Sequence, residues 1–194
     1  MMKDILITAF EPFGNQDKNV SQEVLNRLDE KYIRALLPVS YNRARYEVKR
    51  LLEKYQPKLV LCLGEAGKEK TIRVEKLAIN YTRAIISDND GDLRPQGAIV
   101  EGGQNCYFSP LSVEELVPYL NHLHYPSVLS LTAGGFVCNV VYYTVLEAGY
   151  PALFVHLPYY EGQNTQTEHL PLEMMIEAVQ EILRYFEKRL FNKA

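Results

Sequence analysis

The chain has 194 residues, of which 47% are hydrophobic and 23% are charged, and its formal net charge is −3 at pH 7. This length and composition are typical of one globular domain, so we predict a single domain over residues 1–194. A slightly acidic chain has no overall basic field to attract nucleic acid or an anionic membrane, and no apolar run approaches the ~20 residues of a membrane span. We therefore expect neither nucleic acid nor a membrane among its partners.

Short apolar runs alternate with longer segments of helical period along the chain. This alternation is typical of strands joined by helices, and it predicts an α/β fold with a mostly parallel, twisted sheet and helices on both faces. The strands are expected at Ile5–Phe10, Lys58–Gly64, Ser127–Thr132 and Ala152–Leu157, and the helices at 20–28, 41–55, 113–123, 136–149 and 171–189.

Two of these helices carry further signals. The helix expected at 113–123 begins with Ser112 and Glu115, whose spacing predicts a capping box in which each side chain bonds a backbone N–H of the first turn. The segment Arg43–Lys54 is the most basic in the chain, but its charges alternate with apolar residues. We interpret it as the solvent-facing side of an amphipathic helix rather than as a phosphate-binding stripe.

The segment Ile85–Pro110 is the longest stretch without a periodic pattern, and long loops are often functional or mobile. It contains the acidic run Ser87–Asp92, which superficially resembles a calcium loop. In an EF-hand register, however, Leu93 would occupy the glycine position and Ile99 the final glutamate. We therefore interpret the run as an acidic loop and predict no metal site there.

The three cysteines, Cys62, Cys106 and Cys138, are odd in number and widely spaced, and no CxxC pair is present. A disulfide framework is not expected from this pattern. The start MMKDILITAF is too short for a signal peptide and continues into polar sequence. Together these features predict a reducing, cytoplasmic location.

One cysteine occupies an unusual place in the run LTAGGFVCNVVYY, where a strand is followed by two glycines and a helix. Cys138 would lie in the first turn of that helix, where unpaired N–H groups and the helix dipole favour a thiolate and lower its pKa. The same N–H groups could hold a developing oxyanion. A buried core cysteine explains the residue about as well, because free cysteines are commonly buried.

A nucleophilic thiol usually needs an imidazole nearby, and His156 is the best candidate among the four histidines. It lies at the end of the expected strand Ala152–Leu157, at the sheet edge where the strand before Cys138 also ends. A histidine bonded to backbone at a strand end is the simpler alternative. His122 and His124 fall late in a helix and are expected on the surface, and His169 is expected to be capping or exposed.

Glu75 lies between apolar neighbours in the probable strand Val74–Asn80, where a carboxylate needs a partner. A histidine would be such a partner, which would give a Cys–His–Glu set in the pattern of other catalytic triads. A surface salt bridge is the alternative explanation. None of the three residues is decisive alone.

Four sequence blocks together carry a family resemblance. They are ITAFEPFGN with Asn19, then GEAGKEKTIRVEKLAIN, VLSLTAGGFVCNVVYY and FVHLPYYEGQ, and they extend over residues 7 to 163. In this order they resemble the pyroglutamyl peptidases, cysteine peptidases that remove N-terminal pyroglutamate from peptides. The resemblance implies pyroglutamyl peptides as substrates, no metal or other cofactor, and assembly into a homotetramer.

The resemblance also implies roles for individual residues. Cys138 would be the nucleophile, His156 the general base and then the general acid, and Glu75 the residue that orients the histidine. The residues implied in binding the lactam ring are Phe10 and Phe13 as apolar walls, and Asn19 with the backbone near Glu65 and Val137 as partners of the ring amide.

The chain departs from the family pattern at several positions. Arg73 stands where Ser or Thr is usual, Ile85 stands where many members carry an arginine, and Glu161-Gly162-Gln163 replaces the usual Pro-Glu-Gln. The connection from Cys138 to His156 is also shorter than usual. Two other functions therefore remain as alternatives: a divergent thiol hydrolase of another small cyclic or N-acyl amide, and a non-catalytic α/β binding protein with an inert thiol.

Overall fold

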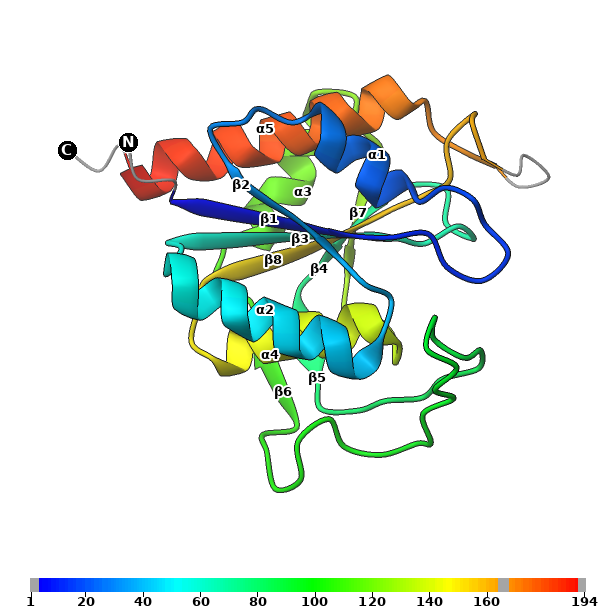
Figure 1. Cartoon of the computed structure of the whole chain (residues 1–194). Helices are drawn as coiled ribbons and strands as arrows, with labels where there is room; N and C mark the ends of the chain where they lie inside the picture. Colours follow the sequence, from blue (N-terminus) through cyan, green and yellow to red (C-terminus); the bar gives the residue numbers. More distant parts are fainter. Residues whose placement is uncertain (1–3, 164–167, 192–194) are drawn as a thin grey trace.

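A twisted sheet of six strands runs through the middle of the molecule (Figure 1). The computed structural model describes residues 4–163 and 168–191. The strand order is β2-β1-β3-β8-β4-β7, and neighbouring strands are parallel except for β4 and β8. The mostly parallel sheet is thus confirmed. Its strands are β1 (Ile5–Phe10), β2 (Ile33–Leu37), β3 (Leu59–Glu65), β4 (Ile72–Glu75), β7 (Ser127–Ser130) and β8 (Ala152–Leu157).

Helices cover both faces of this sheet, as predicted (Figure 1). All six residues of β1 are buried, because alternate side chains enter two separate apolar cores. One core lies under α1 (Val20–Arg27), α3 (Val113–His122) and α5 (Leu172–Phe191), and the other under α2 (Tyr41–Tyr55) and α4 (Val137–Glu147).

None of the helices in the described parts of the chain is both long and apolar enough to cross a bilayer.

The five predicted helices and the four strands predicted from apolar runs are all present, but the other four strands differ from the sequence analysis. β2 was not predicted, and the expected strand Val74–Asn80 is divided at Lys76 into the end of β4 and the short β5 (Leu77–Ile79). β5 pairs with β6 (Cys106–Phe108), which lies inside the segment that had been expected to be irregular. Short strands of this kind depend on pairing between distant segments, so local sequence does not reveal them.

The predicted capping box at the start of α3 is wrong. The Ser112 side chain makes no capping hydrogen bond there. The Glu115 carboxylate instead accepts a hydrogen bond from the Tyr185 hydroxyl at 3.2 Å and pairs with Arg189 at 3.4 Å, both on α5. The contacts between α3 and α5 therefore engage the Glu115 carboxylate that would have completed the capping box.

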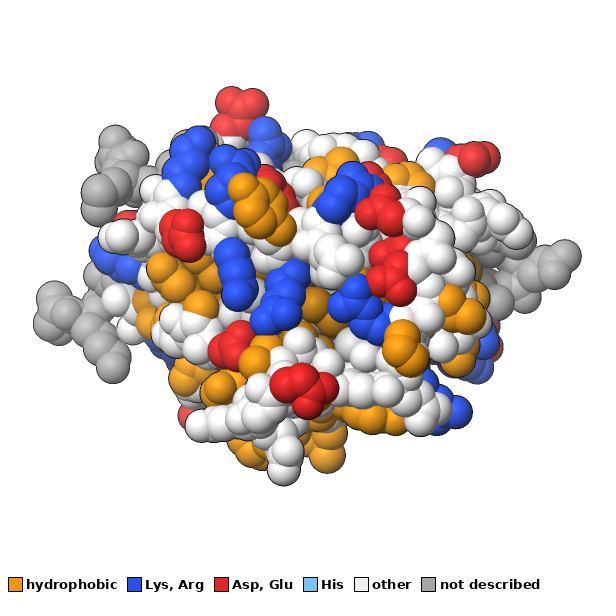
Figure 2. All heavy atoms as spheres, turned by 60° about the horizontal axis from the view of Figure 1, so that its bottom comes forward, with side chains coloured by type: hydrophobic (Ala, Val, Ile, Leu, Met, Phe, Trp, Pro, Cys, Tyr) orange, Lys and Arg blue, Asp and Glu red, His pale blue; other side chains and the backbone are white. Residues whose placement is uncertain are grey.

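The basic segment of α2 is the solvent-facing side of an amphipathic helix, as predicted. Basic and acidic side chains lie interspersed on the face of the molecule shown in Figure 2, and three arginines of α2 have acidic partners. The pairs are Arg43–Asp90 at 2.8 Å, Arg45–Glu147 at 3.9 Å and Arg50–Glu47 at 2.6 Å.

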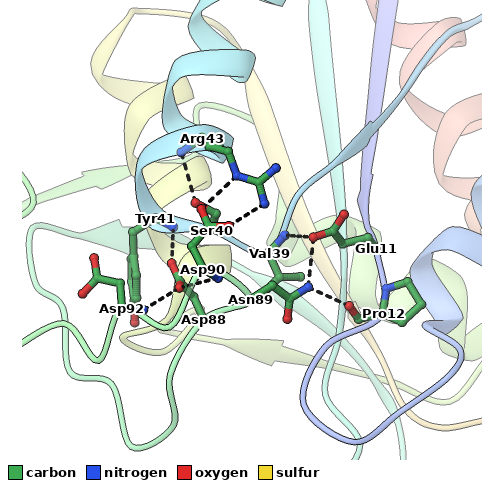
Figure 3. A network of polar contacts seen from close by, with 10 residues as sticks. All are labelled: Glu11, Pro12, Val39, Ser40, Tyr41, Arg43, Asp88, Asn89, Asp90 and Asp92. Atoms are coloured by element: carbon green, nitrogen blue, oxygen red, sulfur yellow. Dashed lines mark hydrogen bonds and ion pairs between the residues drawn. The ribbon is translucent and has the colours of Figure 1, made fainter.

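The acidic run after β5 is fixed to α2 through Asp88, which is only 6% exposed. One carboxylate oxygen accepts a hydrogen bond from the Tyr41 N–H at 2.9 Å, at the start of α2. The other accepts from the N–H groups of Asp90 and Asp92, at 3.0 and 2.8 Å (Figure 3). Asp88 thus stabilises the loop and the helix start at the same time.

The next residue, Asn89, connects the same loop to the turn that follows β1. Its side-chain amide donates to a Glu11 carboxylate oxygen and to the Pro12 carbonyl, both at 2.9 Å, and its N–H donates to the Val39 carbonyl (Figure 3). The Val39 N–H in turn donates to Glu11. The turn that carries Phe13 is therefore held from two sides.

We expect Asp88→Ala to lower the free energy of unfolding by about 1–3 kcal/mol, because it leaves three backbone N–H groups without their acceptor. Urea denaturation followed by circular dichroism measures this loss. Asp90→Ala is the control, because it removes an exposed ion pair with Arg43 and should change stability much less. Equal losses in the two variants would contradict the anchoring role of Asp88.

Candidate active site

A cavity of about 370 Å³ lies at the carboxyl ends of β1, β3 and β8, beside the start of α4. This is the sheet edge where parallel α/β folds bind ligands. Its lining includes all eight residues that the sequence analysis assigned to the site, together with Arg73. Those eight residues are Phe10, Phe13, Asn19, Glu65, Glu75, Val137, Cys138 and His156.

Two glycines place Cys138 at the start of α4. Gly134 has φ +84°, a conformation that other residues rarely adopt. At Gly135 a Cβ atom would lie 2.7 Å from the Arg83 nitrogen, and the Arg83 N–H donates to the Gly135 carbonyl at 2.9 Å. This turn directs the chain into α4, so that Cys138 is its second residue, where the N–H groups have no intrahelical acceptor.

The Cys138 thiol lies over the backbone of β3. A Cβ atom on Gly64 would be 3.1 Å from Cys138 Sγ and 2.8 Å from ring atoms of Phe154. Gly64 is the register partner of His156 in the neighbouring strand, and paired strands lie roughly 4.8 Å apart. Because Gly64 has no side chain, it leaves room for Cys138 Sγ at the sheet position paired with His156.

His156 and Glu75 form a buried pair. Nδ1 of the imidazole is 2.9 Å from Glu75 Oε1, and Glu75 is 0% exposed. The Tyr142 hydroxyl donates to the Glu75 carbonyl at 3.0 Å, and the Phe154 ring packs on the imidazole at 4.6 Å. A carboxylate accepts the Nδ1–H, which leaves Nε2 as the nitrogen that can take a proton.

The protonation of Cys138 differs from the sequence-based expectation. Burial raises the pKa of the Cys138 thiol well above its ordinary value, and the negative charge of Glu75 raises it further. The backbone N–H at the helix start acts in the opposite direction but more weakly, so the expected lowering of this pKa is wrong. Burial also raises the pKa of Cys62 to about 12. Burial and the charge of Glu75 therefore both favour the neutral form of the Cys138 thiol.

The apolar wall of the cavity comes from phenylalanines of two distant segments. Phe10 ends β1 and is 2% exposed, and the Phe13 ring lies 6.0 Å from that of Phe136. Phe136 in turn contacts Tyr41 at 5.5 Å, edge to face. Phe136 was not identified from the sequence, although it directly follows the two glycines before Cys138.

Asn19 has a structural role that the sequence analysis missed. It is the N-cap of α1, and its side-chain oxygen accepts hydrogen bonds from the N–H and the hydroxyl of Ser21 at 2.9 and 2.7 Å. One side-chain N–H donates to the Glu11 carbonyl at 3.1 Å. An amide nitrogen has two donors, so one remains for a ligand.

Glu65 has one engaged and one unengaged carboxylate oxygen. Oε2 accepts from the Val20 N–H at 3.0 Å and from the Gln163 side chain at 2.6 Å. Oε1 is buried and has no hydrogen-bond partner among the residues the structure describes. Burial raises the pKa of Glu65, while the bonds from Val20 and Gln163 lower it less strongly. Gln163, in one of the segments that depart from the family pattern, thus helps to fix the cavity wall.

The other residues singled out from the sequence, at departures from the family pattern or as candidate histidines, lie outside the catalytic arrangement. The Ile85 side chain is 81% exposed and is not part of the cavity lining. The connection between α4 and β8 is the short segment 148–151, which leaves Cys138 and His156 at the same end of the sheet. His122, His124 and His169 are exposed, as predicted.

A thiol, an imidazole and a buried carboxylate beside one apolar cavity are the arrangement of a cysteine hydrolase on an α/β fold. Comparisons with known proteins agree with this class. Residues 3–185 match the family model described as pyroglutamyl peptidase. The chain is 34% identical to the pyrrolidone-carboxylate peptidase of Thermococcus onnurineus, over 93% of this chain and 96% of that protein.

Two solved structures resemble the chain over nearly their whole length. The pyrrolidone carboxyl peptidase of Fervidobacterium islandicum superimposes with a TM-score of 0.91 at 30% identity, covering 96% of this chain and 99% of that one. The Thermococcus litoralis enzyme gives a TM-score of 0.88 at 36% identity, covering 97% and 96%. The chain belongs to the pyroglutamyl peptidase family.

We expect alkylation of Cys138 by iodoacetamide to rise continuously with pH up to pH 9, because reactivity follows the thiolate and burial keeps the Cys138 pKa high. Peptide mass spectrometry on samples quenched at intervals measures the rate at each cysteine. The same protein unfolded in urea is the control, in which the Cys138 rate should approach its plateau at lower pH. A plateau below pH 7 in the native protein would contradict a thiol that is protonated at rest.

Proposed function

We propose that the chain hydrolyses the amide bond after an N-terminal pyroglutamyl residue, with Cys138 as the nucleophile. His156 acts as general base and then as general acid, and Glu75 orients the imidazole. The observation that carries this proposal is the buried contact of 2.9 Å between His156 Nδ1 and Glu75, in the cavity that also contains the Cys138 thiol. Membership of the pyroglutamyl peptidase family supports it.

The reaction begins with the protonated thiol. As Cys138 Sγ attacks the pyroglutamyl carbonyl carbon, its proton passes to His156 Nε2, and the negative charge on the oxygen is stabilised by N–H groups at the start of α4. His156 then gives this proton to the departing amine, and the C–N bond breaks. A water molecule, deprotonated by His156, attacks the thioester and releases pyroglutamate and the thiol.

Recognition of the uncharged lactam requires apolar contact for its methylenes and a few hydrogen bonds for its amide. Phe10 and Phe13 supply the apolar contact. The remaining side-chain donor of Asn19, and backbone groups near Glu65 and Val137, bind the ring C=O and N–H. A proline ring has no such carbonyl and would leave these groups unpaired, so the site discriminates against prolyl peptides.

We expect Cys138→Ala to reduce release of a fluorescent amine from its pyroglutamyl amide by at least roughly a thousandfold, because the nucleophile is lost. Cys106→Ala is the matched control, because Cys106 lies outside the cavity lining and should leave the rate unchanged. The corresponding prolyl amide should be cleaved at least roughly a hundredfold more slowly by the wild type. Equal cleavage of both amides, or full activity of Cys138→Ala, would overturn the proposal.

We also propose a reducing, cytoplasmic location and a homo-oligomeric state, a tetramer by family resemblance. All three cysteines are free, which supports the location. The oligomer is supported by apolar side chains in and directly after β7, the last strand in the sheet order: Val128, Leu129 and Leu131 are 40%, 42% and 63% exposed. Adjacent exposed apolar residues on a sheet edge are typical of protein contacts.

We expect light scattering to give a mass that is a multiple of the 22.3 kDa chain, and Leu131→Asp to shift it towards the monomer. A charge in an apolar contact is costly to desolvate, which is why the assembly should weaken. Leu93→Asp is the control, because Leu93 is similarly exposed, at 58%, but lies in another segment. A monomeric wild type would contradict the proposed assembly.

A further inference from the structure

Arg73 lies beside the proposed catalytic pair. It is the second residue of β4 and the register partner of His156 in the antiparallel strand β8. Side chains two residues apart in a strand point to the same face, so Arg73 and Glu75 share the face that carries His156. The Arg73 side chain is 28% exposed and forms part of the cavity lining.

Two contacts fix the guanidinium in place. Nη1 pairs with Glu69 at 2.9 Å, and Nη2 donates to the buried Ser130 hydroxyl at 2.7 Å. With both ends held, Nε lies 3.7 Å from Glu75 Oε1. This distance is too long for a hydrogen bond but short enough for a strong charge interaction at a partly buried site.

The buried carboxylate of Glu75 requires a positive charge nearby. Its carboxylate is fully buried, Oε1 contacts the imidazole, and Oε2 has no hydrogen-bond partner in the described parts of the chain. Burying a carboxylate beside a neutral imidazole is costly unless a cation is close. The negative charge of Glu75 also opposes formation of the Cys138 thiolate. A cation beside Glu75 lowers the cost of burying this carboxylate and weakens its opposition to the Cys138 thiolate.

We propose that Arg73 is a positioning residue that holds Glu75 as a carboxylate facing His156 and thereby favours removal of the Cys138 proton. The proposal rests on the function proposed above. The charged and titratable groups that line the cavity with His156 are Arg73 and Glu75 from β4, Glu65 from β3, Glu69 between these strands and Cys138 from α4. Arg73 acts through Glu75 and does not touch the scissile bond.

The test uses Arg73→Met and Arg73→Gln, which remove the positive charge, and Arg73→Lys, which keeps it. Removing a positive charge makes every nearby deprotonation less favourable. The profile of Cys138 alkylation against pH should therefore move upward by roughly half to one pH unit in both neutral variants. The pH profile of kcat/KM should move in the same direction, and Arg73→Lys should restore both profiles.

Arg34→Met is the matched control. Arg34 is 29% exposed and pairs with Glu30, as Arg73 pairs with Glu69, but it lies on β2 outside the cavity lining. This variant loses the same charge and should leave both profiles unchanged. A merely structural role of Arg73 would lower thermal stability without moving either profile, and that result would overturn the proposal.

A second substrate separates positioning from direct binding of a substrate carboxylate. A pyroglutamyl amide and a pyroglutamyl dipeptide with a free carboxylate should lose the same factor in kcat/KM in Arg73→Met. A loss confined to a higher KM for the dipeptide would overturn positioning. Alkylation of Cys138 needs no substrate, so its shift tests Arg73 even if the wild type fails to cleave pyroglutamyl amides.

Discussion

The contact between Glu75 and His156 is the constraint on which the site depends, and it follows from the one antiparallel pairing in the central sheet. Because β4 runs against β8, Arg73 stands opposite His156 and Glu75 stands opposite Phe154. The carboxylate is thus placed deeper in the sheet than the imidazole, where it is fully buried and meets Nδ1 rather than Nε2. A parallel β4 would reverse this order and bring Arg73 into the deeper position.

The cavity wall depends on a second, polar constraint that lies away from the reacting groups. The turn that carries Phe13 is bonded through Asn89 to the long loop, and that loop is bonded through Asp88 to α2. Arg94 lies over the Tyr41 ring at 4.6 Å, and Tyr41 contacts Phe136 edge to face, which continues the connection to the apolar wall. The shape of the cavity is therefore set partly by a segment with little regular structure.

The elements that the sequence predicts correctly have strong local signals. Continuous apolar runs identify β1, β3 and β8, and helical period identifies the five helices. β2 has only two buried residues among its five, and β6 is three residues long, so neither has a clear pattern. Cys138, His156 and Glu75 were brought together by residue type and expected position in the sheet, and the family resemblance added the five residues expected to bind substrate. The position of Arg73 and the capping role of Asn19 were not predicted, because both depend on strand register and three-dimensional contacts.

The raised pKa of Cys138 and the Arg73–Glu75 pair together determine the balance of charges in the site. A permanent thiolate over Gly64 would be a second anion close to Glu75, in a cavity that also contains Glu65 and Glu69. Burial instead favours the neutral thiol, and in the proposed mechanism the thiolate forms as its proton passes to His156. The charge separation is then transient and lies between fixed partners, which is the condition under which a preorganised site stabilises a transition state most effectively. Arg73 is the fixed cation that makes a buried carboxylate tolerable before that step begins.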